Sequence, residues 1–288
     1  MLKRLINSLT GRRAGSDASA RAPAASSMAS SGSPGLITAY DVHGREIRIE
    51  RSEWRDGVLL PQLQEKWGQP DELYGLILNA LNDGFLAEVV PASRQLLAID
   101  PMVERGHVVR AIVLMKNGRL DEAGRVLLDA AAKVGETGAI LTNLAKVQEA
   151  RGDEKAAEAT LWKAITLDPN QDNGLGWWLA REREKAGDAG YVVALGKVCA
   201  LPGSWRAKLY LGRHRLATGD IAAALELFRA ALEHGAGNRD VLLAITGDLG
   251  NAGKLVELVE LARPAFDPAV HGPEVGLNLA QAYLQLGR

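Results

Sequence analysis

Histidine and cysteine are the residues through which this chain could most readily bind a metal or form a nucleophile, and both are sparse. The one cysteine, Cys199, excludes an intrachain disulfide and any metal site that needs several thiolates. Five histidines stand far apart, with no pair at the spacing of metal ligands: His43, His107, His214, His234 and His271. We expect His107 to pack inside a helix and His271 to lie in a proline-rich loop. The sequence therefore predicts no catalytic residue, no metal and no cofactor.

Glycines and carboxylates, which could hold phosphates or transfer protons, have simpler explanations here. The string Gly174-Leu175-Gly176 is part of a dinucleotide-binding fingerprint, but no strand pattern precedes it and the third glycine is absent. Carboxylates such as Asp153 and Glu154 stand where helices are predicted to begin, a position in which they stabilise the helix terminus. We therefore predict that the protein is not an enzyme.

Composition limits the class of protein further. Of the 288 residues, 47% are hydrophobic and 24% are charged, and the formal net charge is −1. This balance is typical of a soluble protein and shows none of the basic excess that nucleic-acid binding requires. No apolar run reaches the roughly 18 residues that a membrane span needs. We expect a soluble, cytoplasmic protein.

Tryptophan is concentrated in one part of the chain. Four of the six tryptophans lie between positions 162 and 205: Trp162, Trp177, Trp178 and Trp205. Core packing explains such a cluster, and an exposed Trp177 that anchors a partner is the alternative, because aromatic residues are enriched at interface hot spots. Both interpretations stay open at this point.

The arrangement that must position these residues is a repeat of about 34 residues. Seven glycines recur at spacings of 34, 34, 35, 32, 34 and 34 residues: Gly84, Gly118, Gly152, Gly187, Gly219, Gly253 and Gly287. The surrounding text recurs with them, as in KNGRLDEAGRVL at 116–127 and ATGDIAAALELF at 217–228. Internal repetition of this length indicates stacked helical hairpins. The irregular spacing around Gly187 predicts a local distortion there.

Helix signals flank each of these glycines. A glycine past the end of a helix can adopt positive φ, and Asp153 or Asp220 next to it can cap the helix that follows. Prolines 101, 169 and 202 fall where second helices should end. Small residues such as Ala157 and Ala224 stand where two helices must approach closely. No single hairpin buries its own apolar stripe, so each must stack on its neighbours.

With this period and these small residues, the chain resembles the tetratricopeptide repeat (TPR) family over roughly residues 70–288. The resemblance implies an all-α, right-handed solenoid of about 6.5 helix-turn-helix repeats, that is, six complete hairpins and one further helix. It also implies that the first helix of each repeat lines a groove that binds a protein or peptide.

Residues that match the family's groove positions follow from the same resemblance. They are Tyr74, Asn82, Ile112, Lys116, Thr142, Lys146, Trp177, Arg181, Arg206, Arg213, Asn251 and Gln281. Lys146, Arg181 and Arg213 share one repeat position in three successive units, so the middle of the groove is predicted to favour an acidic peptide. A solvated helical face with incidental charges is the alternative.

The N-terminal part differs from the repeats. Residues 1–35 are basic and rich in Ala, Ser and Gly, which predicts a disordered tail. Residues 36–69 are predicted to form a β-hairpin that turns at His43-Gly44, followed by a short helix over 58–67 with Trp54 and Trp67 as anchors. This segment is expected to pack on the first helices of the domain at 70–288.

Three functional hypotheses follow. The first is a non-catalytic scaffold or adaptor that holds a protein or peptide, without nucleic acid. The second is the substrate-docking arm of a larger enzyme such as a glycosyltransferase. The third is a membrane-associated assembly factor tethered weakly through residues 1–13, whose leucines and cations alternate at helical spacing. Self-association through the last, uncapped helix is a further expectation.

Overall fold

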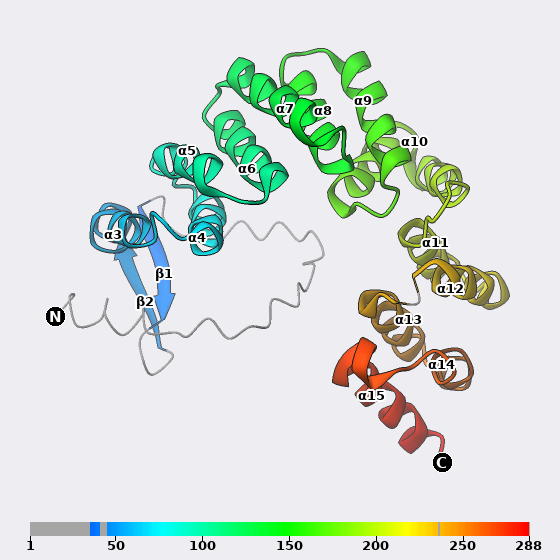
Figure 1. The fold of residues 1–288 in the computed structure, drawn as a ribbon. Helices are drawn as coiled ribbons and strands as arrows, with labels where there is room; N and C mark the ends of the chain where they lie inside the picture. Colours follow the sequence, from blue (N-terminus) through cyan, green and yellow to red (C-terminus); the bar gives the residue numbers. More distant parts are fainter. Residues whose placement is uncertain (1–34, 41–44, 236, 288) are drawn as a thin grey trace. The chain divides into compact units, whose positions relative to one another are not determined.

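The computed structural model of the chain describes residues 35–40, 45–235 and 237–287. The tail predicted for residues 1–35 therefore lies almost entirely outside the described residues. Contacts divide the chain into two units, with the boundary between Val126 and Leu127. We describe each unit by itself (Figure 1).

The predicted β-hairpin is present at the start of the first unit. Strands β1 (Leu36–Tyr40) and β2 (Glu46–Glu50) pair antiparallel, with Ile37 opposite Ile49. In β2, Ile49 is buried whereas the glutamates and Arg48 are exposed, so the alternation expected of a half-buried strand is confirmed. The proposed turn at His43-Gly44 lies outside the described residues.

The helix after the hairpin begins earlier than predicted. Helix α2 (Arg51–Trp54) follows β2 directly and continues through a π-helical segment (Arg55–Leu59) into α3 (Leu60–Glu65), whereas we predicted a helix over 58–67. The backbone N–H of Arg51 donates to the carbonyl of Gly35, which starts the helix at the hairpin itself.

Of the two predicted tryptophan anchors in this segment, one is confirmed and one is wrong. Trp54 packs against a buried cluster that includes Leu59 and Ile77, so the hairpin segment rests on α4 as expected. Trp67 follows the end of α3 and is 39% exposed.

Helices in the order of the repeats make up the rest of the chain. They are α4 (Pro70–Asn82), α5 (Val90–Ile99), α6 (Val103–Lys116), α7 (Leu120–Val134), α8 (Gly138–Ala150), α9 (Glu154–Leu167), α10 (Asp172–Cys199), α11 (Arg206–Ala217), α12 (Ile221–Gly235), α13 (Arg239–Asn251), α14 (Leu255–Ala262) and α15 (Pro268–Gln285).

Taken with the two bends described below, the described residues hold six helix pairs and one further helix, as the period predicts. Figure 1 shows α8 beside α9 and α11 beside α12, and these partners are in contact. The all-α class and the stacked pairs are thus confirmed.

The seven periodic glycines all have φ between +62° and +86°, which a side chain would make unfavourable. Asp153 and Asp220 cap the second helices as predicted, each accepting a backbone N–H at 3.1 and 3.2 Å respectively. The residues that recur in the sequence therefore form the turns between helices and the caps at helix starts.

The predicted distortion near Gly187 is a bend inside α10. Ala186 (φ −142°) and Gly187 (φ +62°) leave the helical conformation, and the two halves of α10 form one hairpin. A Cβ on Gly190 would lie 2.4 Å from the carbonyl oxygen of Glu182, so the halves approach at a glycine.

Helix α15 has a similar bend at Gly272, and it corrects one expectation. His271 does not lie in a loop but in the first turn of α15, where it is 3% exposed and its Nδ1 accepts the N–H of Asp267. His107 is buried in α6 as predicted.

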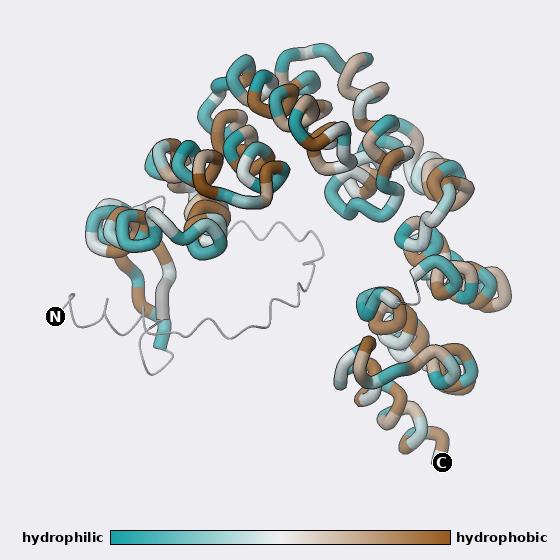
Figure 2. Tube along the Cα trace, viewed as in Figure 1, coloured by the Kyte–Doolittle hydropathy of each residue, from teal (hydrophilic) through white to brown (hydrophobic). Residues whose placement is uncertain are grey.

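Two buried clusters hold the second unit together. One joins α11 to α15 around Phe228, and the other joins α8, α9, α10 and α11 around Leu195. Figure 2 shows apolar and polar residues alternating along the helices, as expected where one side of each helix packs on its neighbours.

Candidate functional site

First helices of successive repeats lie side by side in the second unit. Helix α10 contacts α8 and α11, and α13 contacts α11 and α15. Seven predicted groove residues are carried by these helices and are not fully buried, and we call them the first-helix face: Lys146, Trp177, Arg181, Arg206, Arg213, Asn251 and Gln281. Thr142 also belongs to α8, but it is 1% exposed with its hydroxyl 3.4 Å from Oε1 of Gln171, so it cannot contact a ligand in this structure.

The first unit carries the other four predicted groove residues, on α4 and α6. Asn82 and Lys116 are exposed, whereas Tyr74 and Ile112 are half-buried. The guanidinium of Arg105 lies 5.0 Å from the ring centroid of Tyr74. Asn82 lines a hollow of about 360 Å³ whose wall includes the aromatic rings of Trp54 and Phe85.

Arg181 lies on α10, within the first-helix face, and is held by its neighbours. Its guanidinium pairs with Glu149 of α8 and lies 5.6 Å from the ring centroid of Trp177, one turn earlier. Only 15% of its side chain is exposed. Arg181 therefore joins two repeats and orients the Trp177 ring, and little of its charge reaches solvent.

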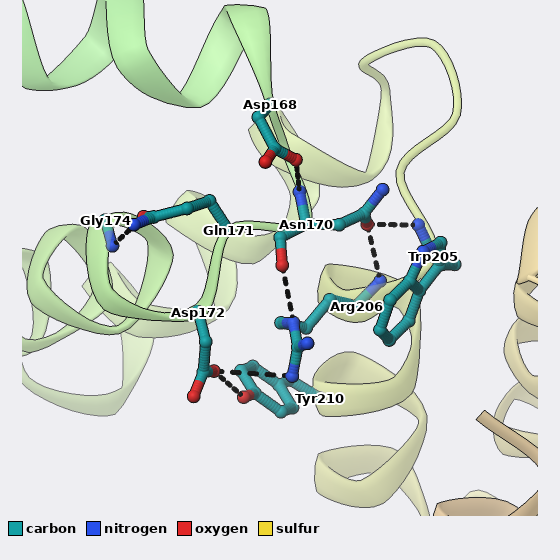
Figure 3. A network of polar contacts seen from close by, with 8 residues as sticks. All are labelled: Asp168, Asn170, Gln171, Asp172, Gly174, Trp205, Arg206 and Tyr210. Atoms are coloured by element: carbon teal, nitrogen blue, oxygen red, sulfur yellow. Dashed lines mark hydrogen bonds and ion pairs between the residues drawn. The ribbon is translucent and has the colours of Figure 1, made fainter. Parts of the chain in front are cut away.

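Arg206 belongs to a polar network between α9, α10 and α11 (Figure 3). Its Nε donates to the carbonyl of Asn170 at 2.7 Å, and its Nη1 lies 3.4 Å from Asp172 Oδ1. Asp172 Oδ1 also accepts the hydroxyl of Tyr210 at 2.7 Å.

Asn170 is the centre of the same network. Its side-chain oxygen accepts the backbone N–H groups of Trp205 and Arg206 at 2.9 and 3.0 Å, and its Nδ2 donates to the carbonyl of Gly203. Sequence reasoning missed Asn170, although its place right after Asp168-Pro169 is a position from which a side chain can cap the next helix. These contacts indicate that Arg206 holds two repeats together.

Arg213 is the most exposed of the three arginines, with 52% of its side chain accessible. Its Nε donates to both carboxylate oxygens of Asp248 on α13, at 2.9 and 3.0 Å. That pair does not use the two terminal nitrogens, which carry four N–H donors. Arg213 can therefore hold Asp248 and still bind a carboxylate of a ligand.

A shared spacing connects these ion pairs. Arg181–Glu149, Arg206–Asp172 and Arg213–Asp248 join residues 32, 34 and 35 positions apart, about one repeat in each case. Arg239–Glu274, and Arg105–Asp71 in the first unit, have the same kind of spacing. Sequence reasoning placed the arginines on this face but did not predict that they pair with acids one repeat away. The predicted basic character is thus largely balanced by neighbouring carboxylates.

A polar pocket of about 160 Å³ lies between α13, α14 and α15. Asn251 and Gln281, predicted from different repeats, both line it, together with Asn278 and Gln285. Asn278 Nδ2 donates to the hydroxyl of Thr246 at 3.0 Å. Carboxamides offer both donors and acceptors without net charge, which suits the N–H and C=O groups of a peptide backbone. The structure therefore brings two predicted residues into one pocket and adds two that were missed.

Residues with catalytic or metal-binding potential are not assembled in the part of the chain described here. Among these residues, no group of three or more His, Cys, Asp or Glu is arranged to hold a metal. Cys199 ends α10, and burial raises the pKa of its thiol to about 11. Every helix in the described part of the chain is too short or too polar to cross a membrane.

Comparisons with known proteins agree with the repeat architecture. The family model described as Tetratricopeptide repeat matches residues 108–172 and 186–239. No curated protein gives a significant match.

Among the solved structures that are similar to the chain are three of low sequence identity. A structure from the functional characterisation of Pseudomonas aeruginosa pilF is 17% identical in sequence, with a TM-score of 0.37. The match covers 76% of this chain and 97% of the pilF chain. A tetratricopeptide repeat protein of Parabacteroides merdae is 13% identical over 76% and 87%, with a TM-score of 0.35. YrrB, a TPR protein with an unusual peptide-binding site, is 13% identical over 80% and 98%, with a TM-score of 0.32. At these values none of the three carries an argument about function.

Proposed function

Because this chain is a tetratricopeptide repeat protein, we propose that it binds a protein or peptide and that the first-helix face carries the contact. TPR repeats commonly mediate protein and peptide binding. The role that fits is that of a non-catalytic scaffold or adaptor, in which one preformed surface holds a partner without changing it chemically.

The observation that carries this proposal is the amide pocket between α13, α14 and α15. Asn251 and Gln281 come from different repeats and are exposed, yet they line the same 160 Å³ pocket. An extended peptide has one N–H and one C=O per residue that must be paired when water is removed. A row of carboxamides can satisfy both groups independently of the ligand's side chains.

Two further residues of the first-helix face, Arg213 on α11 and Trp177 on α10, supply anchors. Arg213 has terminal nitrogens that its pair with Asp248 does not use, and α11 directly contacts α13. Trp177, whose ring is half-buried and lies near Arg181, offers an apolar surface. We propose that the ligand places one carboxylate at Arg213 and a backbone segment at the amide side chains. The ligand then needs a single acidic group, and not the generally acidic peptide that we predicted from the sequence.

Affinity capture with matched variants tests this function. Wild-type protein would be used as bait in an extract of its source cells, beside the triple variant Arg213→Gln, Asn251→Ala and Gln281→Ala. All three side chains are exposed, so the variant should fold normally. The control is Arg229→Gln on α12, an exposed position outside the first-helix face at which the same single positive charge is removed.

A partner retained by the wild type and the control but lost from the first variant supports the proposal. A partner retained equally by all three proteins would show that binding uses another surface. The two other hypotheses, an enzyme's docking arm and a tether through residues 1–13, stay predictions, because no feature of the described residues favours them.

A further inference from the structure

A second pocket, larger than the amide pocket, lies between α9 and both halves of α10. It has a volume of about 560 Å³ and is lined by Lys155, Glu158, Ala159, Trp162, Trp178 and Lys197. None of these residues belongs to the first-helix face. The volume lies within the range of pockets that bind small ligands or a large side chain with its neighbours.

Two tryptophans form the apolar part of this pocket. The ring centroids of Trp162 and Trp178 lie 5.2 Å apart, with a tilt of 44° between the planes. Trp178 is 6% exposed, and its buried indole Nε1 has no hydrogen-bond partner in the described residues. Buried indole N–H groups are normally paired, so this one is a donor for which the described residues supply no acceptor.

The charges around the pocket are predominantly positive. Lys155 and Lys197 are exposed, and neither forms an ion pair with any residue that the structure describes. The one acidic lining residue, Glu158, accepts Lys185 Nζ at 3.1 Å, and Lys185 also pairs with Glu182, so the charge of Glu158 is only partly balanced. An incoming carboxylate would therefore meet two lysines without a competing intramolecular partner.

We propose that this tryptophan pocket is a docking site for a segment of a partner protein in which a large apolar side chain is flanked by acidic residues. The apolar side chain packs on Trp162 and Trp178, and the carboxylates pair with Lys155 and Lys197. The chain's own residues 1–13 are the wrong occupant, because Lys3, Arg4, Arg12 and Arg13 would bring like charge to the lysines.

Peptide titration followed by NMR tests this site on the full chain. The probe is a capped pentapeptide with a central phenylalanine and two aspartates on each side. Three controls share its length: one replaces phenylalanine by alanine, one replaces the aspartates by asparagines, and one replaces them by lysines. The readout is the indole N–H signal of Trp178, identified by its loss in Trp178→Phe.

Saturable binding of the acidic phenylalanine peptide, with a shift of the Trp178 signal, is the expected result. The three control peptides should bind about tenfold more weakly or not at all, because each lacks one half of the recognition. Equal binding of the asparagine or lysine peptide would refute the role of the lysines. Absence of any shift with the acidic phenylalanine peptide would refute the site.

Variants separate this site from nonspecific charge attraction. Lys155→Glu with Lys197→Glu should weaken binding about tenfold, and Ala159→Gln should also weaken it, because a larger, uncharged side chain would occupy part of the pocket. The matched control is Arg229→Glu with Arg263→Glu, which makes the same change in net charge at exposed positions outside the pocket. Equal weakening in both double variants would contradict the proposal.

Discussion

Asn170→Ala tests whether one side chain from the end of a repeat starts the next repeat. In the structure, Asn170 Oδ1 accepts the N–H groups of Trp205 and Arg206, where α11 begins. Helix α11 has no side-chain cap of its own, since Trp205 occupies its N-cap position. The substitution leaves those donors without a protein acceptor and also removes the bond from Nδ2 to Gly203.

The expected cost follows from these bonds. Loss of a helix cap costs about 0.5–2 kcal/mol, and loss of a further hydrogen bond about 0.5–1.5 kcal/mol. The bond from Arg206 Nε goes to the backbone carbonyl of residue 170 and survives the substitution. We therefore expect a loss of about 2 kcal/mol in local stability, concentrated at the junction between α10 and α11.

Native-state hydrogen exchange measures this effect locally, because repeat proteins do not always unfold in one step. The amides of Trp205 and Arg206 should exchange about 30-fold faster, at about 1.4 kcal/mol for each factor of ten. The control is Asn173→Ala, an exposed residue in the first turn of α10 whose side chain makes no hydrogen bond within the described residues. If both variants exchange alike at these amides, the capping role of Asn170 is wrong.

Three further predictions concern packing, an ion pair and a thiol. Gly212→Ala should destabilise the protein by about 1–3 kcal/mol in urea denaturation, because its Cβ would lie 2.6 Å from the Phe228 ring, whereas Gly196→Ala, with nothing within 4 Å, should stabilise it by about 0.5–1 kcal/mol. Asp100→Asn should cost about 3 kcal/mol in the same assay, because a side chain that is 1% exposed accepts Arg105 Nε at 2.8 Å, and a loss below 1 kcal/mol would contradict this. Burial raises the pKa of the Cys199 thiol from 9.0 to about 11, so between these pH values the unfolded chain loses the thiol proton more readily than the folded chain. The free energy of unfolding should therefore fall as the pH rises from about 9 to about 11. Cys199→Ala should remove this part of the pH dependence, measured by urea denaturation.

The regular part of the fold could be predicted because its signals are local. Each periodic glycine marks a residue with positive φ, and the aspartates after Gly152 and Gly219 mark helix caps, so the turn signal recurs along a single sequence. Prediction from local signals failed in the N-terminal segment, whose sequence does not recur elsewhere in the chain. Arg51 starts a helix earlier than predicted because it bonds to Gly35 across the hairpin, a contact that no propensity reveals.

The candidate site was predictable in its positions but not in its charges. Repeat numbering placed Arg181, Arg206 and Arg213 on the first helices. It did not reveal that each has a carboxylate on the neighbouring first helix, because that pairing depends on how repeats stack. The tryptophan pocket was even harder to predict from the sequence, because Trp178 and Lys197 come together only through the bend at Gly187.

Site-specific photo-crosslinking tests the central claim, that a protein or peptide ligand binds the first-helix face, most directly. A benzophenone side chain would be placed in turn at position 251, at position 281 and, as the control, at exposed position 229 on α12. The account predicts that positions 251 and 281 form covalent adducts with the same ligand and that position 229 does not. Adducts at position 229 alone would place the ligand on the second helices and contradict it.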